Sequence, residues 1–359
     1  MKKVFVAMSG GVDSSVTAAL LVRRGFDVVG VYMKCWSENN PCAISDEADA
    51  HRVAAQLKIP FYTFDFEKEY SKKVVGYMVR GYQNGITPNP DVMCNREIKF
   101  GLFLKTALRW GADYIATGHY VKMQKSKCKN QNDNSKCKII YNLFQAKDLN
   151  KDQSYFLWTL TQDQLKHCMF PIGGYTKPEV RVLAKKFGLS TATKKDSQGI
   201  CFLGQVKVDD FLEKRLAGVK PGSICTLDGV VVGEHRGAEL YTMGQRHGLG
   251  IGGDGPYFVV KKDIKKNIVY VAKEDDTQHF KKELVAKKVH WISSVSIAFP
   301  MQILCRTRYR QPLVRATITP RDGGGVHVVF DKLHRSVTPG QSIVFYKGKK
   351  MLGGAIIKV

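Results

Sequence analysis

Apolar and polar residues alternate in blocks along the first third of the chain. Short apolar runs rich in β-branched residues predict buried strands at residues 3–8, 28–33 and 61–64. Longer segments between and after them predict helices at residues 15–24, 46–57 and 68–84. Strands that alternate with helices predict a parallel, doubly wound α/β sheet, and such a sheet binds ligands at the carboxyl ends of its strands.

The pattern changes after about residue 205. From about residue 282, basic residues alternate with β-branched residues, for example at 306–310 and 314–318, and this alternation predicts a small β-barrel. The region between them shows glycine-rich strand patterns after a short predicted helix. We therefore predict three domains, at residues 1–205, 206–281 (a small central domain) and 282–359 (the barrel).

The segment Ser9-Gly10-Gly11-Val12-Asp13-Ser14 connects the first predicted strand to the first predicted helix. Glycines allow the backbone to approach a ligand, and the free amides and dipole of a helix N-terminus favour an anion. A tight turn without a ligand is the alternative. The complete hexapeptide resembles the loop of the PP-loop ATP pyrophosphatases, which implies that it holds the pyrophosphate of ATP during adenylation. GMP synthetases, NAD synthetases and tRNA-modifying enzymes share this loop, so it does not define the substrate.

Other predicted strands end at the same edge of the sheet. Met33 ends the second strand and is placed to line an adenine pocket, with a plain core methionine as the alternative. The strand that begins at Tyr114 ends in Gly118 and His119. Gly118 would allow a nucleotide to approach closely, and His119 would project into the cleft unless its role is structural.

Cys94 follows a loop with two prolines, and a helix is predicted over residues 98–110. Asp91 or Asn95 could cap this helix. If Cys94 lies near the first turn, the helix dipole and Arg96 would lower the pKa of its thiol and favour the thiolate. The alternative is that Cys94 is a small buried apolar residue.

The chain has nine cysteines, an odd number that argues against a structural disulfide framework in a cytosolic protein. Cys201 follows Gly199 and is close in sequence to Lys194 and Lys195, whose charges could support a thiolate. Cys94 and Cys201 are therefore the candidates for thiol chemistry.

The formal net charge is +24, from 56 Lys and Arg against 32 Asp and Glu. This excess implies a polyanionic partner, most simply nucleic acid, although a solvated lysine-rich surface accounts for part of it. The polar segment 122–138 is predicted to be a flexible insertion, and its Cys128 and Cys137 lack the further ligands of a zinc site. No metal site is predicted. No apolar run approaches a membrane span and no signal peptide is recognised, so we expect a cytoplasmic monomer without a membrane partner.

Motifs from the whole chain stand in a characteristic order. They are Ser9–Ser14, Asn89-Pro90-Asp91 with Cys94, Thr117-Gly118-His119-Tyr120, Lys151-Asp152-Gln153-Ser154-Tyr155, Gly199-Ile200-Cys201-Phe202 and Arg308-Tyr309-Arg310-Gln311. This combination resembles the tRNA-specific 2-thiouridylases. The resemblance implies a PP-loop nucleotide-binding domain, a small central domain and a C-terminal β-barrel, and an ATP-dependent reaction that replaces the C2 oxygen of a wobble uridine in tRNA with sulfur.

The resemblance also implies roles for individual residues. ATP, with Mg²⁺ on its phosphates, would be bound by Ala7, Met8, Ser9, Gly10, Gly11, Val12, Asp13, Ser14, Met33 and Gly118. The target base would contact Asn89, Pro90 and Asp91, and the tRNA would contact His119, Lys151, Asp152, Gln153, Arg308, Tyr309 and Gln341. Cys201 would carry sulfur as a persulfide, delivered by a sulfur-donor protein in a relay from a cysteine desulfurase. Cys94 would be the partner nucleophile that ends in a disulfide with Cys201, and Asp91 is a candidate general acid or base unless it is a helix cap.

Two other classes of function share parts of this pattern. An amidating PP-loop ligase would need an ammonia source, and the chain shows no glutamine amidotransferase domain and would leave Cys94 and Cys201 without a role. A non-catalytic RNA-binding protein would not need the complete loop or both cysteines. We therefore expect an ATP-dependent tRNA-uridine sulfurtransferase.

Overall fold

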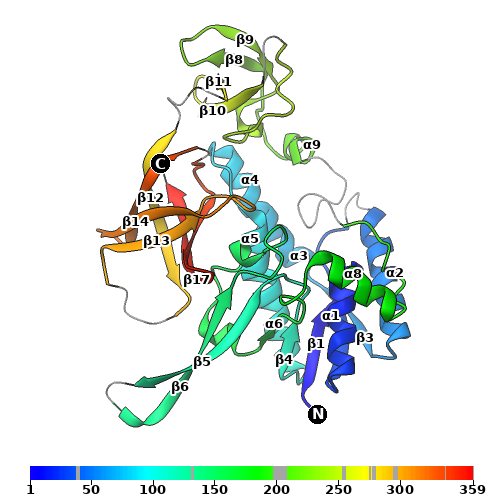
Figure 1. Cartoon of the computed structure of the whole chain (residues 1–359). Coiled ribbons are helices and arrows are strands. Elements are labelled where there is room, and N and C mark those ends of the chain that lie inside the picture. Colours follow the sequence, from blue (N-terminus) through cyan, green and yellow to red (C-terminus); the bar gives the residue numbers. More distant parts are fainter. Residues whose placement is uncertain are drawn as a thin grey trace.

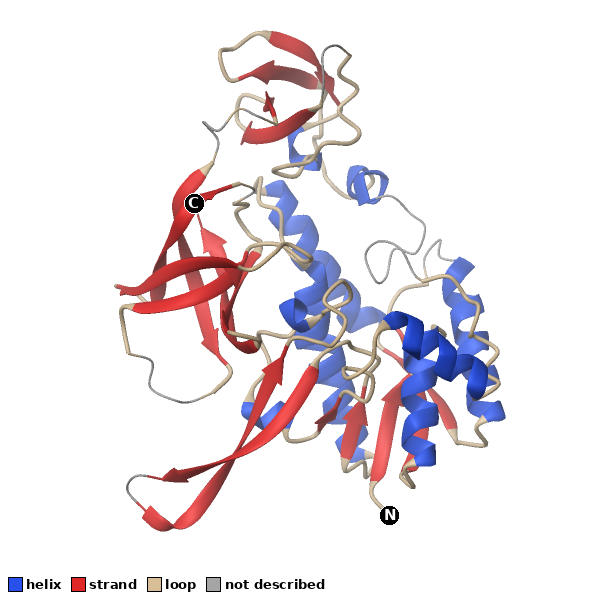
Figure 2. Ribbon diagram, in the orientation of Figure 1, coloured by secondary structure: helices blue, strands red, loops and turns tan. Residues whose placement is uncertain are grey.

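The computed structural model describes residues 1–37, 41–130, 133–196, 208–252, 256–274, 276, 280–293, 298–335 and 337–358. An N-terminal α/β unit, a small sheet and a β-barrel follow one another along the chain (Figure 1). Figure 2 shows that helices gather around the N-terminal sheet, while strands dominate the rest of the molecule. Within the described part of the chain, no helix combines the length and apolar character needed to cross a membrane.

The N-terminal sheet has the strand order β3-β2-β1-β4-β7, and every neighbouring pair is parallel. Its strands are β1 (Lys3–Ala7), β2 (Asp27–Lys34), β3 (Phe61–Asp65), β4 (Tyr114–Ala116) and β7 (Cys168–Met169). Val4 and Val6 pack with one apolar cluster and Phe5 packs with another, so both faces of β1 are buried. This burial explains the continuous apolar runs in the sequence, and the predicted parallel sheet is confirmed.

Helices cover both faces of this sheet. Those that pack with Val4 and Val6 are α1 (Val12–Arg23), α2 (Pro41–Gln56) and α8 (Lys177–Lys186). The opposite face is covered by α3 (Glu67–Tyr70), η1 (Ser71–Val75) and α4 (Gly76–Gln83), and by α5 (Pro90–Cys94), η2 (Asn95–Phe103) and α6 (Leu104–Arg109). Two shorter helical segments, η3 (Ser154–Phe156) and α7 (Gln162–Leu165), follow later.

The helix that carries Cys94 begins earlier than predicted. It starts at Pro90, before the start that a cap at Asp91 or Asn95 would give, because a proline at the first helical position lacks only an N–H that would have no helical partner. The predicted caps Asp91 and Asn95 are wrong. Asn89 caps the helix, since its side-chain oxygen accepts a 3.1 Å hydrogen bond from the backbone N–H of Val92.

The second sheet is small and has the order β10-β11-β8-β9. It follows α9 (Val208–Glu213) and contains β8 (Gly222–Thr226), β9 (Val231–His235), η4 (Ala238–Leu240), β10 (Tyr257–Asp263) and β11 (Ile268–Lys273). The predicted short helix and glycine-rich strands of this region are present.

The C-terminal barrel is closed. Its strands run in the order β12-β15-β14-β13-β16-β17, and β17 pairs back onto β12. They are β12 (Lys281–Trp291), β13 (Met301–Arg306), β14 (Val314–Arg321), β15 (Gly325–His334), β16 (Ser342–Lys347) and β17 (Lys350–Lys358). The alternating apolar residues fill the barrel with a core that includes Ile303, Val328 and Phe345, so the predicted barrel is confirmed.

The predicted flexible insertion at residues 122–138 is wrong. Strands β5 (Lys122–Asn130) and β6 (Asp133–Phe144) form an antiparallel hairpin that projects from the molecule in Figure 1. Lys350 and Met351 of β17 pair with Phe144 and Leu143 of β6, so the hairpin extends the sheet of the barrel. Residues 124–127 of β5 are exposed, so polar side chains are compatible with this part of the hairpin, while Asn142 and Leu143 of β6 are buried where the hairpin meets the barrel.

Candidate nucleotide and RNA site

The glycine loop lies between β1 and α1, where the sheet ends. Gly10 has a positive φ of 70°, and a Cβ there would lie 2.2 Å from the backbone oxygen of Asp46, so only glycine fits. Gly11 is the N-cap of α1, and no side chain caps this helix. The Ser14 hydroxyl accepts from the Ser9 amide at 3.1 Å and donates to the Gly11 oxygen at 3.0 Å, which shapes the loop from within. The first turn therefore presents its amides to an anion.

Met33 and Gly118 lie near this loop, as the strand pattern predicted. Ala7 pairs with Val31, so Met33 lies just beyond the end of β1 on the neighbouring strand. A Cβ on Gly118 would lie 2.9 Å from the Ser14 amide nitrogen. The predicted nucleotide residues Ala7–Ser14, Met33 and Gly118 are thus brought together at one edge of the sheet, and their contacts with ATP remain a prediction.

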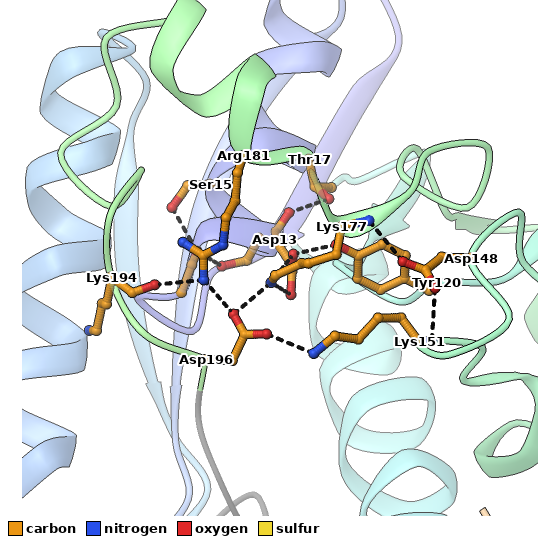
Figure 3. A network of polar contacts seen from close by, with 12 residues as sticks. Asp13, Ser15, Thr17, Tyr120, Asp148, Lys151, Lys177, Arg181, Lys194 and Asp196 are labelled. Carbon is orange, nitrogen blue, oxygen red and sulfur yellow. Dashed lines mark hydrogen bonds and ion pairs between the residues drawn. The ribbon is translucent and has the colours of Figure 1, made fainter. Parts of the chain in front are cut away.

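A lysine from a distant helix reaches the loop. The Lys177 ammonium lies 2.7 and 2.8 Å from the two carboxylate oxygens of Asp13 and 2.8 Å from Asp196 (Figure 3). The Tyr120 hydroxyl donates to the same Asp13 carboxylate at 2.7 Å. Burial and the Asp13 carboxylate raise the pKa of Tyr120, so this hydroxyl stays protonated. Sequence analysis missed Lys177, because its position at the start of α8 shows only a Thr176 capping box and no sign of what its side chain contacts.

Asp196 forms ion pairs with Lys177 and with two further basic side chains. It pairs with Lys151 at 2.7 Å and with Arg181 at 2.8 Å in addition to Lys177. Burial raises the pKa of Asp196, but the hydrogen bonds and charges of Lys151 and Lys177 outweigh it and lower that pKa to about 2. The carboxylate is therefore ionised at neutral pH, next to a group of positive charges that lies beside the loop.

Lys194 connects the same chain segment to α2. Its ammonium lies 2.6 Å from Asp46 and 2.5 Å from Asp49. Since the backbone oxygen of Asp46 also contacts Gly10, the segment before residue 197, α2 and the loop form one polar assembly. Lys194 is one of the two lysines that sequence analysis associated with a Cys201 thiolate, and it is used in these ion pairs.

The predicted catalytic residues lie partly within the described structure. Cys94 is buried at the end of α5, and Asp91 is half-buried in the first turn of the same helix. Pro90 begins this helix, which Asn89 caps. Cys201 lies outside the described residues, so its predicted roles as persulfide carrier and disulfide partner of Cys94 stay predictions.

Several predicted tRNA residues have contacts within the protein. His119 is buried and its Nδ1 lies 2.8 Å from the Thr117 hydroxyl, and burial lowers the pKa of His119 well below its usual value. The buried carboxylate of Asp152 pairs with Arg306 of the barrel. The Gln153 side-chain oxygen accepts from the Tyr120 amide at 2.9 Å. These groups hold neighbouring segments of the protein together, and whether they also touch tRNA stays a prediction.

The remaining predicted tRNA residues lie where the barrel meets the other two units. Arg308 donates to the backbone oxygen of Met243 and, at 3.0 Å, to the Thr338 hydroxyl. Tyr309 is half-buried, and its ring centroid is 4.6 Å from that of Phe156. Gln341 donates to backbone oxygens just before α5. The candidate residues therefore form two groups, one at the glycine loop and one at the barrel junction.

Across the described residues, no three His, Cys, Asp or Glu side chains are arranged to hold a metal ion. At the loop, the Asp13 carboxylate is paired with Lys177. A magnesium ion that enters on nucleotide phosphates needs few protein ligands. The residues at the loop therefore fit Mg²⁺ that is bound mainly by ATP and water.

Family models match the chain in three consecutive parts. They are described as a tRNA methyl transferase HUP domain at residues 2–205, a tRNA methyl transferase PRC-barrel domain at residues 209–273 and an aminomethyltransferase beta-barrel domain at residues 281–357. Together with the uncapped glycine loop on a parallel sheet, these matches define a HUP-domain protein with two appended β domains.

Curated relatives specify the family. The tRNA-specific 2-thiouridylase MnmA 2 of Geobacillus kaustophilus is 48% identical over 361 residues, which cover 99% of this chain and 94% of the relative. The tRNA-specific 2-thiouridylase MnmA of Halalkalibacterium halodurans matches with the same identity and coverage. The chain belongs to the tRNA-specific 2-thiouridylase family, although the domain descriptions carry the word methyl transferase. Among solved structures, a 4-thiouridine synthetase–RNA complex with bound ATP is 17% identical, with a TM-score of 0.36 over 60% of this chain and 50% of its own.

Proposed function

We propose that this protein is an ATP-dependent tRNA-uridine sulfurtransferase that replaces the C2 oxygen of the wobble uridine with sulfur. The observation that carries the proposal is the uncapped first turn of α1, with the Lys177 ammonium beside it. Amides that no side chain caps and an adjacent cation suit the pyrophosphate of ATP. The relatives at 48% identity, named 2-thiouridylases, support tRNA uridine as the substrate.

The first step would activate the base. A uridine C2 carbonyl is a poor electrophile because oxide is a poor leaving group. Attack of the C2 oxygen on the α-phosphate of ATP forms an O–P bond and releases pyrophosphate. The amides after Gly10 and the ammonium of Lys177 would stabilise the charge that develops on this leaving group. The uridine must leave its stack to reach the cleft.

The second step would transfer sulfur through two thiols. The terminal sulfur of a persulfide on Cys201 attacks C2, and AMP leaves with the original oxygen. The Cys94 thiolate then attacks the inner sulfur of Cys201, which breaks the S–S bond and leaves sulfur on the uridine. A Cys94–Cys201 disulfide forms, and a thiol reductant must regenerate both thiols. Asp91, on the first turn of the Cys94 helix, would serve as general acid or base.

The supporting components follow from this chemistry. Mg²⁺ would accompany the ATP phosphates, and a sulfur-donor protein in a relay from a cysteine desulfurase would load Cys201. We expect the protein to act as a cytoplasmic monomer. The predicted contacts of ATP with Ala7–Ser14, Met33 and Gly118 are supported by their common position at the sheet edge.

Radiolabelled ATP tests the proposal. Release of AMP and pyrophosphate is expected only when tRNA is present, and mass spectrometry of digested tRNA should then find 2-thiouridine. Cys201→Ser should abolish 2-thiouridine while leaving ATP and tRNA binding nearly unchanged. Pyrophosphate release that needs ammonia instead of tRNA would favour an amidating ligase and contradict the proposal.

A further inference from the structure

Two chain segments that are distant in sequence meet at the barrel junction. The Thr87 amide donates to the Pro339 oxygen at 3.1 Å, and the Gln341 side-chain nitrogen donates to the oxygens of Thr87 at 3.0 Å and Pro88 at 3.2 Å. The Asn89 side-chain nitrogen donates to the Gln341 side-chain oxygen at 3.3 Å. We call the contact between residues 87–89 and 339–341 the clasp.

The clasp is closely packed. Gly340 has a φ of 89°, and a Cβ there would lie 2.0 Å from a methyl carbon of Ile86 and 3.0 Å from the Thr87 oxygen. Thr87 and Asn89 are buried. Next to Gln341, the backbone oxygen of Ser342 accepts a 2.9 Å hydrogen bond from the buried Tyr155 hydroxyl. The two segments therefore have little freedom to shift relative to each other.

Asn89 connects the clasp to the helix of Cys94. Its side-chain oxygen accepts from the Val92 amide and caps α5, while its side-chain nitrogen donates to Gln341. Because the two ends of this amide bond to different segments, a change in Gln341 removes one of the contacts that orient Asn89. The barrel is thus joined through one side chain to the start of the helix that ends at Cys94.

We propose that Gln341, besides its predicted contact with tRNA, is a positioning residue that sets the helix of Cys94 through Asn89. The expected effect on catalysis rests on the proposed function. A tRNA bound by the barrel would then be aligned with the Cys94 thiol by the protein itself, because barrel and helix share the clasp. The clasp provides this alignment before the substrate binds.

The first test compares Gln341→Glu with Gln302→Glu, the same chemical change at an exposed position of β13. A carboxylate at position 341 cannot donate to the Thr87 and Pro88 oxygens and repels them. We expect the rate of Cys94 alkylation by iodoacetamide, followed by peptide mass spectrometry, to rise about tenfold, and kcat for 2-thiouridine formation to fall about tenfold. Because the alkylation is measured on the protein without tRNA, a contact of Gln341 with tRNA cannot account for a faster rate. Gln302→Glu should change none of these quantities.

A second pair of variants covers the case in which Gln341→Glu does not fold. Asn89→Asp keeps the cap acceptor but loses the donor to Gln341, and Gln341→Leu removes the opposite partner. If both act through one contact, the double variant should alkylate no faster than the faster single variant. An unchanged rate of Cys94 alkylation in both Gln341 variants would overturn the proposal and leave Gln341 with a role in tRNA contact alone. If the wild-type protein forms no 2-thiouridine, the proposed function fails, while the alkylation rates still decide whether the clasp positions Cys94.

Discussion

Two ion-pair networks, one at the glycine loop and one at the barrel junction, differ in their access to water. At the loop, the side chains of Asp13 and Asp196 are 32% and 25% exposed, although both pair with Lys177. At the junction, Arg306 and Asp152 are 3% and 0% exposed. Arg306 also donates to the Tyr346 hydroxyl, so its charge has partners only inside the protein.

This difference separates two uses of charge. Partly exposed pairs contribute little to folding because water competes with each partner, and a bound phosphate can replace a carboxylate at the same cation. A fully buried pair cannot exchange its partners, and loss of one partner leaves the other charge without compensation. We therefore expect the loop network to serve ligand binding and the Arg306–Asp152 pair to fix the barrel to the α/β unit.

The largest expected effect comes from breaking the buried pair. Arg306→Ala leaves the Asp152 carboxylate buried without its cation, so the free energy of unfolding should fall by about 3–5 kcal/mol in urea titrations. The matched control is Arg335→Ala, which removes an exposed pair with Glu274 whose side chains are 55% and 56% exposed. This control should cost less than about 1 kcal/mol. Equal losses in the two variants would remove the contrast between the networks.

The next effect concerns catalysis at the loop. Lys177→Met should lower kcat/KM for tRNA-dependent AMP release by about 100-fold, because a cation beside the leaving pyrophosphate is lost. Its effect on the free energy of unfolding should be smaller than that of Arg306→Ala. Lys147→Met is the control, since Lys147 forms an exposed ion pair with Glu179, which lies on α8 as Lys177 does. Full activity of Lys177→Met would show that the loop amides suffice.

Sequence patterns predicted those features of the fold that depend on residues close to one another along the chain. The apolar runs predicted the parallel sheet, Gly10 and Gly118 predicted a close approach of backbone at the loop, and basic alternation predicted the barrel. The contacts of Lys177 with Asp13 and of Gln341 with Pro88 could not be predicted, because each joins residues more than a hundred positions apart. The partners of Asp196 lie 15 to 45 positions away, and no local pattern signals them. The patterns also failed at the β5–β6 hairpin, where residues 124–127 of β5 are exposed and show no apolar alternation, and at the Cys94 helix, where Pro90 was interpreted as part of a loop.

A smaller effect distinguishes two neighbouring arginines at the barrel junction. Arg310 is exposed and its guanidinium lies 5.3 Å from the centroid of the Tyr309 ring, whereas the Arg308 guanidinium is used within the protein. Arg310→Ala should weaken tRNA binding about threefold and lower the slope of log K against log salt by about one. Arg308→Ala should mainly reduce stability. A lower salt slope for Arg308→Ala with Arg310→Ala unchanged would reverse this assignment.

The smallest effect is a dependence of stability on pH at the loop network. The pKa of Asp196 is lowered from its ordinary value of 3.8 to about 2, although burial opposes the hydrogen bonds of Lys151 and Lys177. Because the unfolded chain binds this proton at higher pH than the folded chain, the stabilisation is complete above about pH 4 and is lost as pH falls toward about 2. Asp196→Asn removes this pH-dependent stabilisation. The urea midpoint of the variant should therefore fall less steeply than that of the wild type between about pH 4 and about pH 2. Parallel midpoint curves for the two proteins would mean that the Asp196 pairs do not stabilise the fold, and that the carboxylate serves only to hold Lys151 and Lys177 beside the loop.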